Sequence, residues 1–577
     1  MAHLYKKIKK GHEYYYIRET QRVYGKPTTI NQVYLGTADK VQTALDKGGF
    51  SPKEFGSVFM LNEVDRLLDL AGIVNEILPP KKKTKGPSLG ELVFYAALNR
   101  AIAPTSKRRL ASWYETTDIQ RIRPLRLESL NSQNFWNHWD RINPADLEKI
   151  STIFFKKVLG LLPSPEPHLL VEADNIYSSP RNTATVGFEL DEEYAPELSR
   201  QRVGLALVTE RSAGVPLYYQ TFRGGLSGGE AFERHLEAIL ARVGQLGVKP
   251  RQVTLLLNPG FDPAGVIDRV DRDQGLHFIA SCSPDEVPEL TKISLKEFTP
   301  LNSKLSGRTG ELDRDEDKIL YYETQADFWN RPRKVVIVFD PKTFNLSYQD
   351  LGKRVQKVRK ELLALQQRYQ QEGFPEDAPK STREHLSQLC QRLRLSPSLF
   401  DLNFHEENGS LRMDFQLNHR QMADKVRRFG KNILITDHED WRAAEIYEVY
   451  AKRYLSETQG AGAKAQGPTD NPFQAALMPL YHWTDSKIRV HMFVCLVALT
   501  YLALLCQRLK TAGLKIPPRE VMEELRSLRT AIYSSEDEGK LKRIIEPVSD
   551  SQAAILKALG YDVLDGKIQS LPHSLGS

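Results

Sequence analysis

The stretch YAKRYLSETQGAGAK, from Tyr450 to Lys464, places four chemically distinct side chains at helical spacing. Arg453 follows Tyr450 by three residues, Glu457 follows four later, and Lys464 follows seven after that. Such steps return to one face of an α-helix, so a phenol, two cations and a carboxylate are expected to point the same way. This grouping is typical of a site that holds a metal ion beside a phosphate. The alternative, for the pattern taken alone, is a solvated helix face with an ordinary ion pair.

Two further segments flank this stretch in the sequence. ILITD, residues 433–437, reads as a strand that precedes the helix, and PLYHWTDSKIRVHMFV, residues 479–494, follows it. With these segments the chain resembles the bacterial insertion-sequence transposases of the DDE type, in the group with a Tyr-(2)-Arg-(3)-Glu-(6)-Lys signature. It is most similar to the long members, which share a YYYIRE-like start and a YHWTD-x-KIRVH segment. The resemblance covers nearly the whole chain.

The resemblance implies phosphoryl transfer on DNA assisted by two Mg²⁺ ions. In that chemistry one ion activates the attacking water or 3′-hydroxyl, and the other stabilises the leaving oxygen. Three carboxylates hold the ions in the family pattern: an Asp at the end of the first strand, an Asp after the fourth, and the Glu of the signature helix. The resemblance also implies that Tyr450, Arg453 and Lys464 contact phosphate or DNA near the cut site. Arg453 would clamp a phosphate bidentately, and Lys464 would act as a point charge.

Two of the three carboxylate positions differ from the family pattern. Glu457 supplies the third carboxylate, but the first position falls on Glu172 in LLVEADNIY, where the extra methylene displaces the oxygens. The second position falls on Asn258 in TLLLNPG, which is neutral and removes one negative charge. The nearest acids that could replace them are Asp174, on the same strand face as Glu172, and Asp262, beyond a Pro-Gly turn.

Three functional hypotheses follow. The preferred one is a transposase-derived protein that recognises transposon-end-like DNA and whose strand cleavage and transfer are lost or impaired. The second is a working transposase whose Mg²⁺ ions are held by Glu172 or Asp174, Asp262 and Glu457. The third, of another class, is an RNase H-like nuclease or RNA-binding protein, because that fold hosts several nucleic-acid activities. An engineered change at Asn258 would leave Glu172 unexplained, so natural loss is preferred.

Composition and charge agree with a nucleic-acid partner. The 577 residues carry a formal net charge of +7, with 41% hydrophobic and 27% charged residues. The basic excess is concentrated near the N-terminus, in KKIKK (residues 6–10), KKKTK (81–85), KRR (107–109) and RIRPLR (121–126). Such runs favour a polyanionic partner, although they are also common on solvated surfaces.

The cysteines and the one long apolar segment indicate the cellular compartment in which the protein is expected. The 4 cysteines have no CxxC pair or metal-finger spacing, which predicts buried thiols in a reducing compartment. No signal peptide is expected, since the start is basic and polar. VHMFVCLVALTYLALLC, residues 490–506, is short for a membrane span and carries His491, so we predict a buried core helix. The expected location is the bacterial cytoplasm, in association with the nucleoid, and the family implies a homodimer.

The predicted fold is an α/β RNase H-like core with an α/β insertion, preceded by a β-hairpin and a helical module and followed by a helical C-terminal region. Strand-like segments at 168–177, 202–210, 215–222, 253–260 and 276–281, with a helix at about 229–246, follow the order of that core. The hairpin within residues 12–36 is either a structural ribbon or an arm that grips DNA. The predicted domains are a basic β-hairpin arm (1–56), a helical DNA-binding module (57–165), the first part of the core (166–282), the insertion (283–430), the signature-helix part of the core (431–468) and the helical C-terminal region (469–577).

Overall fold

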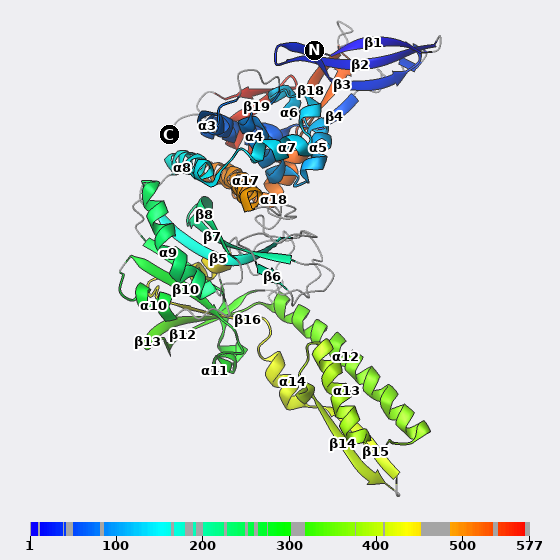
Figure 1. The fold of residues 1–577 in the computed structure, drawn as a ribbon, viewed down its shortest axis with the longest axis vertical. Coiled ribbons are helices and arrows are strands. Elements are labelled where there is room, and N and C mark those ends of the chain that lie inside the picture. Colours follow the sequence, from blue (N-terminus) through cyan, green and yellow to red (C-terminus); the bar gives the residue numbers. More distant parts are fainter. Residues whose placement is uncertain are drawn as a thin grey trace. The chain divides into compact units, whose positions relative to one another are not determined.

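The computed structural model shows a mixed α/β chain whose helices and strands are drawn in Figure 1. The chain divides into two compact units, the first made of residues 1–254 and 454–577 and the second of residues 255–453. The structure describes residues 2–9, 12–38, 40–41, 50–80, 86–162, 167–178, 189–191, 200–223, 228–247, 252–258, 264–273, 275–301, 318–375, 377–407, 410–451, 485–534 and 541–571.

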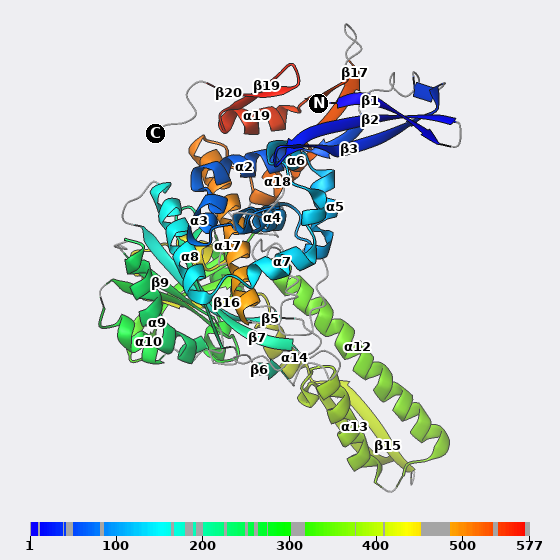
Figure 2. The same cartoon turned by 45° about the horizontal axis from the view of Figure 1, so that its top comes forward.

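One long apolar helix, α17 (Asp485–Thr511), is the core of the helical part of the first unit (Figure 2). By length and composition it would suit a membrane span, but 83% of its most apolar window is buried inside the protein. The prediction of a buried core helix at residues 490–506 is therefore confirmed. The other described helices of this unit outside the strand-rich part are α2 (Gly56–Leu68), α3 (Leu70–Ile77), α4 (Leu89–Ile102), α5 (Leu110–Thr116), α6 (Ile119–Ile122), α7 (Ser132–Trp139), α8 (Pro144–Gly160), α18 (Pro518–Ser527) and α19 (Asp550–Ala558).

Local signals in the sequence set where these helices begin. At the start of α4, Ser88 and Glu91 form a capping box in which each side chain accepts a hydrogen bond from the other residue's backbone N–H. At the start of α8, Asn143 accepts from the backbone N–H of Asp146, and Pro144 occupies the first helical turn. The helical module predicted from residue 57 onward is thus present as a series of helices, of which α3, α4, α7 and α8 have a side-chain N-cap.

The N-terminal residues form an antiparallel three-stranded sheet of β1 (Ala2–Lys9), β2 (His12–Val23) and β3 (Lys26–Gly36). The predicted hairpin is β2 and β3, and Tyr24 and Gly25 take the positive φ angles that its tight turn requires. The basic lead-in before the hairpin is itself a strand, because β1 pairs with β2 along its whole length.

The C-terminal region contains strands that the sequence interpretation missed. The expectation that residues 469–577 are helical is wrong in part, because the described residues after α18 form strands as well as helix α19. Strand β17 there pairs with β4, which lies almost 500 residues earlier in the chain, and such a long-range pairing leaves no local signal. The strands concerned are β4 (Phe50–Glu54), β17 (Arg529–Ser534), β18 (Leu541–Ile545), β19 (Tyr561–Leu564) and β20 (Lys567–Ser570).

The strand-rich part of the first unit contains the segments predicted for the start of the core. The second strand pairs antiparallel with the first and with the third, and the predicted helix follows. The next strand, β9, carries the chain from the first unit into the second. The elements are β5 (His168–Ser178), β6 (Glu189–Asp191), β7 (Arg200–Glu210), β8 (Val215–Arg223), α9 (Gly228–Gln245) and β9 (Gln252–Leu257).

The second unit is built on a sheet with the strand order β11-β12-β13-β16-β10-β9. The first two long strands of the predicted insertion, β12 and β13, are members of this sheet, because β13 pairs with β16 over six residue pairs. Besides β9, the strands named in this order are β10 (Leu276–Cys282), β11 (Thr299–Pro300), β12 (Leu320–Phe328), β13 (Arg331–Phe339) and β16 (Lys431–Thr436). The helices that follow β9, β10 and β16 in the chain are α10 (Ala264–Val270), α11 (Pro288–Thr291) and α15 (Ala443–Ala451).

The rest of the predicted insertion is an α/β arm with its own apolar core. Its long helix buries a stripe that includes Leu351, Val355, Val358 and Leu362, at the three- and four-residue steps of an amphipathic helix. The elements of the arm are α12 (Pro341–Glu372), α13 (Ala378–Arg392), β14 (Phe400–Glu407), β15 (Ser410–Leu417) and α14 (His419–Val426).

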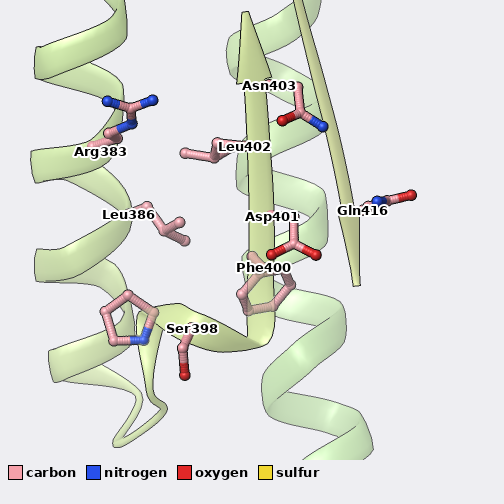
Figure 3. Close-up of a pocket in the computed structure, with 9 residues that line it drawn as sticks. Arg383, Leu386, Ser398, Phe400, Asp401, Leu402, Asn403 and Gln416 are labelled. Atoms are coloured by element: carbon pink, nitrogen blue, oxygen red, sulfur yellow. The ribbon is translucent and has the colours of Figure 1, made fainter. Parts of the chain in front are cut away.

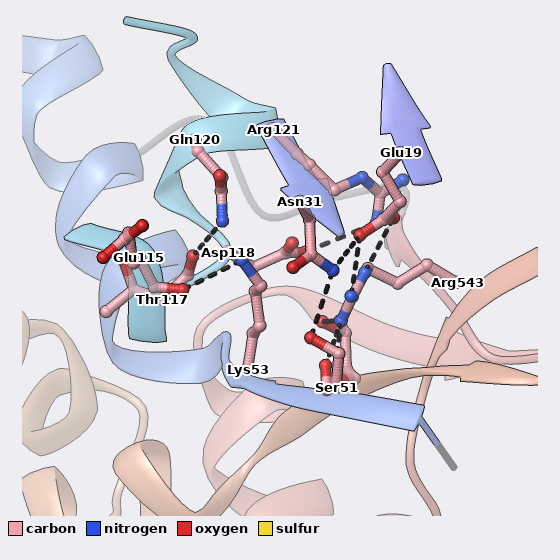
Figure 4. Close-up of polar contacts among 11 residues, drawn as sticks. Glu19, Asn31, Ser51, Lys53, Glu115, Thr117, Asp118, Gln120, Arg121 and Arg543 are labelled. Atoms are coloured by element: carbon pink, nitrogen blue, oxygen red, sulfur yellow. Dashed lines mark hydrogen bonds and ion pairs between the residues drawn. The ribbon is translucent and has the colours of Figure 1, made fainter. Parts of the chain in front are cut away.

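A buried polar cluster joins the N-terminal sheet to β18 (Figure 4). Arg543 donates to both carboxylate oxygens of Glu19, at 2.8 and 3.0 Å, and the two side chains are only 2% and 6% exposed. Asn31 donates to Glu19 at 2.8 Å, and Arg543 also donates to the carbonyl oxygen of Ser51 at 2.9 Å. Burial alone would raise the pKa of Glu19, but the hydrogen bonds and charge of Arg543 hold it below its ordinary value.

Lys53 of β4 lies beside this ion pair. Its ammonium group donates to the carbonyl oxygen of Glu115 in α5 at 2.9 Å. Burial, together with the nearby charge of Arg543, lowers the pKa of Lys53 to about 8. The cluster therefore ties strands β2, β4 and β18 and the end of α5 into one body.

We predict that Glu19→Gln destabilises the protein by about 3–5 kcal/mol at neutral pH, because it leaves the buried guanidinium of Arg543 without a counter-charge. Chemical denaturation monitored by circular dichroism measures this loss. The folded pKa of Glu19 is lowered, so its stabilising contribution is present above the ordinary carboxyl range and is lost as the pH falls through the folded value. The difference between wild type and variant should therefore shrink in acid.

Glu13→Gln is the matched control for this prediction. Glu13 pairs with Lys6 at 2.8 Å on the same sheet, but both side chains are over 40% exposed, so its loss should leave stability unchanged. Equal losses for the two variants would contradict the assignment of the buried pair as the stabilising contact.

Candidate catalytic and DNA-contact positions

Glu172 lies inside strand β5 and is 3% exposed. Its backbone is paired with Leu207 of β7, and its neighbours Val171 and Ala173 are also buried. The strand predicted at residues 168–177 is present as β5, which ends one residue later, and β7 pairs with it as far as Ser178. Glu172 therefore lies in the middle of this strand, whereas the family pattern has its Asp at the strand end. The carboxylate of Glu172 is thus enclosed in the body of the first unit.

Asn258 is the residue immediately after β9. It follows a buried run that includes Leu255, Leu256 and Leu257, and its own side chain is half-buried. The strand predicted at residues 253–260 ends earlier, at Leu257, so Asn258 lies just after it, where the family pattern has an Asp. Of the replacement acids, Asp262 lies outside the described residues, as does the side chain of Asp174.

The signature stretch is described only at its start. Tyr450 lies near the end of α15, where it is 1% exposed and is among the largest fully buried side chains. Its ring therefore packs in the core of the second unit. Arg453, Glu457 and Lys464 fall in residues 452–484, outside the described residues, and so do His482 and Trp483.

The described donor set does not fit a pair of Mg²⁺ ions. Mg²⁺ is a hard cation that is usually held by carboxylate oxygens and waters. Of the two described positions, Glu172 offers a carboxylate and Asn258 offers a neutral amide, which leaves the set one negative charge below the family pattern. Within the described ranges, no three His, Cys, Asp or Glu side chains come together as a metal-binding group.

Arg489 connects the start of α17 to β8. Its guanidinium donates to the carboxylate of Asp485 and to the hydroxyl of Thr221, each at 2.7 Å. The hydroxyl of Tyr219 donates to the backbone carbonyl of Arg489 at 3.3 Å. These contacts give Arg489 a structural role at the start of α17.

The basic runs are partly structural. Arg123 of the RIRPLR run donates to the fully buried carboxylate of Asp65 at 2.7 Å. Lys107 of the KRR run lies 4.8 Å from the centre of the Trp139 ring, and burial of its ammonium group, with the charge of Arg100, lowers its pKa to about 7. Some of the cations in these runs therefore stabilise the fold, and only the others are available to a DNA-binding surface.

The cysteines are free thiols, as expected. Cys390 and Cys495 are buried, whereas Cys282 and Cys506 are partly exposed, so the prediction of four buried thiols holds for two of them. Burial raises the pKa of Cys506 to about 12, and that of Cys282 rises to a similar value through burial and a hydrogen bond to Glu286. These thiols are protonated at neutral pH and are poor nucleophiles.

A cavity of about 550 Å³ lies in the arm of the second unit, between α13 and the start of β14 (Figure 3). Its charged lining residues are Arg383 and Asp401, and Asp401 accepts a hydrogen bond from Asn418 at 3.1 Å. The cavity is open, and its lining does not include a nucleophile paired with a base. The remaining lining residues are Leu386, Pro397, Ser398, Phe400, Leu402, Asn403 and Gln416.

Comparison with protein-family models and with curated proteins finds no match. Among solved structures, the chain is similar to the piggyBac transposase, in a cryo-EM structure of its synaptic complex with hairpin DNA. The similarity covers 81% of this chain and 78% of that chain, with 10% sequence identity and a TM-score of 0.32. The comparisons therefore do not assign the chain to a family.

We predict that Arg489→Met lowers the stability of the first unit by about 1–3 kcal/mol, because it leaves the Thr221 hydroxyl and the Asp485 carboxylate without their charged partner. Urea denaturation gives the size of the loss. Arg519→Met is the control, since the ion pair of Arg519 with Glu523 is more than 60% exposed on both sides. A loss for the control as large as that for Arg489→Met would refute this role.

Proposed function

We propose that the chain is a transposase-derived protein that binds transposon-end-like double-stranded DNA as a homodimer and in which strand cleavage and transfer are lost or impaired. The observation that carries this proposal is the donor set. An enclosed Glu172 on β5 and a neutral Asn258 at the end of β9 occupy positions where the family pattern has Asp.

The succession of elements supports an RNase H-like core as the scaffold of this function. In the described part of the chain, three strands (β5, β7 and β8, with the short β6 between the first two) are followed by α9, β9, α10 and β10. This is the strand, strand, strand, helix, strand, helix, strand order expected for such a core. Buried strands that are followed by polar residues, as β9 is by Asn258, bring polar groups to the sheet edge at which ligands bind.

The chemistry of the two substitutions supports impaired cleavage. Glu172 keeps the charge, but its longer side chain moves the carboxylate by about one bond length, and misplacement on the order of 1 Å costs about 100-fold in rate. Asn258 keeps the shape of Asp but removes a charge that a divalent cation requires. The two changes act on different properties, position and charge, so neither compensates the other.

We assign the remaining signature residues to DNA binding. Arg453 and Lys464 supply cations for phosphate groups, and an arginine guanidinium suits a bidentate contact. Tyr450 is buried, so in this proposal it packs the helix that leads into the signature, and its hydroxyl reaches DNA only if that helix moves. The proposal includes no cofactor other than the Mg²⁺ that strand cleavage would require.

Strand cleavage on duplex DNA with matched terminal repeats, in Mg²⁺ and in Mn²⁺, tests the proposal beside a gel shift on the same DNA. The wild type should bind in a salt-sensitive manner and leave the strands intact. The double variant Glu172→Asp, Asn258→Asp should gain metal-dependent cleavage, whereas Glu172→Asp alone should gain little because the missing charge is not restored.

The control for added charge is Asn403→Asp, at an exposed amide on β14 of the second unit. It should leave both binding and cleavage unchanged. Cleavage by the wild type that disappears with Glu457→Gln would overturn the proposal and indicate that Asp174 or Asp262 supplies the missing oxygens. Failure to bind the duplex at any salt concentration would overturn the DNA-binding function itself.

A further inference from the structure

The N-terminal sheet has one face rich in tyrosine. The strand registers place Tyr5 opposite Tyr16, Tyr16 opposite Tyr34, and Lys7 opposite Tyr14. Because side chains directly opposite each other lie on the same side of a sheet, these residues share one face. We call it the tyrosine face, and its described members are His3, Tyr5, Lys7, Lys9, His12, Tyr14, Tyr16, Arg18, Gln32 and Tyr34.

Part of the opposite face of the same sheet packs into the protein interior, whereas its outer part, with Leu4 and Ile8, is exposed. The packed part carries Ile17, Leu35 and Glu19, all less than 10% exposed. Ile17 and Leu35 pack with Ile532 of β17, and Glu19 forms the buried ion pair with Arg543. These contacts attach the sheet to the rest of the protein. The rings on the other face take no part in that attachment.

The rings of the tyrosine face form a contiguous group that solvent can reach. The ring centre of Tyr34 lies 5.3 Å from that of Tyr16 and 6.2 Å from that of Tyr14, and the rings are tilted with respect to each other. Tyr34 is 56% exposed, and the rings of Tyr5, Tyr14 and Tyr16 are partly exposed. A cluster of exposed tyrosines costs solvation free energy, so its presence points to a ligand that covers it.

The charge of this face is of one sign. Lys7 and Lys9 are exposed, and Arg18 adds a third cation. The described members of the face include no Asp or Glu, since Glu13 and Glu19 both point to the other side. Cations without acidic neighbours beside solvent-accessible rings are complementary to a polyanion with aromatic groups.

Arg18 is held in place before any ligand arrives. Its guanidinium lies over the ring of Tyr5, 3.4 Å from the ring centre, and donates to the side-chain oxygen of Gln32 at 3.0 Å. A planar guanidinium that is fixed in this way loses little conformational entropy when it binds a phosphate or stacks on a base.

We infer that the tyrosine face binds single-stranded DNA, with bases stacked on Tyr34, Tyr16 and Tyr14 and phosphates held by Lys7, Lys9 and Arg18. Exposed rings on a sheet, flanked by cations, are a stacking platform for unpaired bases. In a duplex the bases are already stacked on one another, so a duplex would use only the cations and leave the rings unexplained. The choice of DNA over RNA rests on the proposed function; the stacking surface itself does not.

Fluorescence anisotropy with the full-length chain and a labelled oligo-dT of about 15 nucleotides tests this inference, within the site sizes of single-stranded DNA-binding domains. The chain should bind oligo-dT more tightly than a duplex of the same length without terminal repeats. Tyr34→Ala should weaken binding about tenfold or more, whereas Tyr34→Phe should keep it, because stacking needs the ring and not the hydroxyl. Tyr348→Ala is the matched control, since Tyr348 is 51% exposed on α12.

The cations are tested by salt dependence. The double variant Lys7→Gln, Lys9→Gln should reduce the slope of log affinity against log salt by about 1.4, the value for two phosphate contacts on a single strand. Lys357→Gln with Lys360→Gln, two exposed lysines of α12, should leave the slope unchanged. Thermal melts of all variants establish that each is folded as the wild type.

Four outcomes would overturn the inference. They are equal binding by Tyr34→Ala and wild type, loss of binding with Tyr34→Phe, tighter binding of the repeat-free duplex than of oligo-dT, and tighter binding of oligo-U than of oligo-dT. A gel shift on terminal-repeat duplex, run in parallel with Tyr34→Ala, separates this result from the proposed function. That duplex binding should be unaffected by the variant, so either conclusion can fail without the other.

Discussion

The buried pairing of Glu19 with Arg543 is the contact on which the order of the N-terminal sheet depends. It joins two residues near opposite ends of the chain, and both are removed from water. Two charges pay a large desolvation cost at such a site, so they are stable only with a complete set of hydrogen bonds, which Asn31, Ser51 and Thr530 help to supply. Because this arrangement is geometrically demanding, it fixes one orientation of the sheet and leaves its other face outward.

That orientation separates two roles within one sheet. The face with Ile17 and Leu35 contributes to folding, and the face with Tyr16 and Tyr34 remains open to solvent. The two readings of the hairpin, structural ribbon or nucleic-acid-binding arm, therefore apply to its two sides. The contacts with Ile532 and Arg543 give one side its structural role, and the other side is the one we infer to bind nucleic acid.

Much of the secondary structure could be predicted from the sequence, for identifiable physical reasons. The buried strands β7 and β9 contain apolar runs, and the apolar run of α17 is short for a membrane span and carries His491, which predicted a core helix. Strand β17 could not be predicted, because its partner β4 is distant in the chain and its own six residues carry little pattern. From the sequence, Glu19 and Arg543 would be taken for ordinary surface residues, because only the fold brings the two side chains together.

The candidate site was predictable in its residue types and less so in its environment. The resemblance identified Glu172 and Asn258, and helical spacing identified Tyr450, but exposure depends on tertiary packing. Tyr450 illustrates this, since helical periodicity placed it on a face with charged residues whereas packing makes it one of the most buried rings in the chain. Lys107 is a second case, because a lysine in a basic run is expected to be fully charged and its surroundings lower its pKa to about 7.

The burial of α17 has a consequence for how the chain is made. Its covering helices α2, α4 and α8 leave the ribosome long before it does, so they present an apolar groove to the cell until α17 emerges. During that interval the nascent chain exposes the surface that chaperones recognise, and after release an unfilled groove is a site for aggregation. Truncated chains that end before residue 485 consequently lack the helix that covers the apolar surfaces of the helical module. Such chains can be purified only if another apolar helix covers those surfaces.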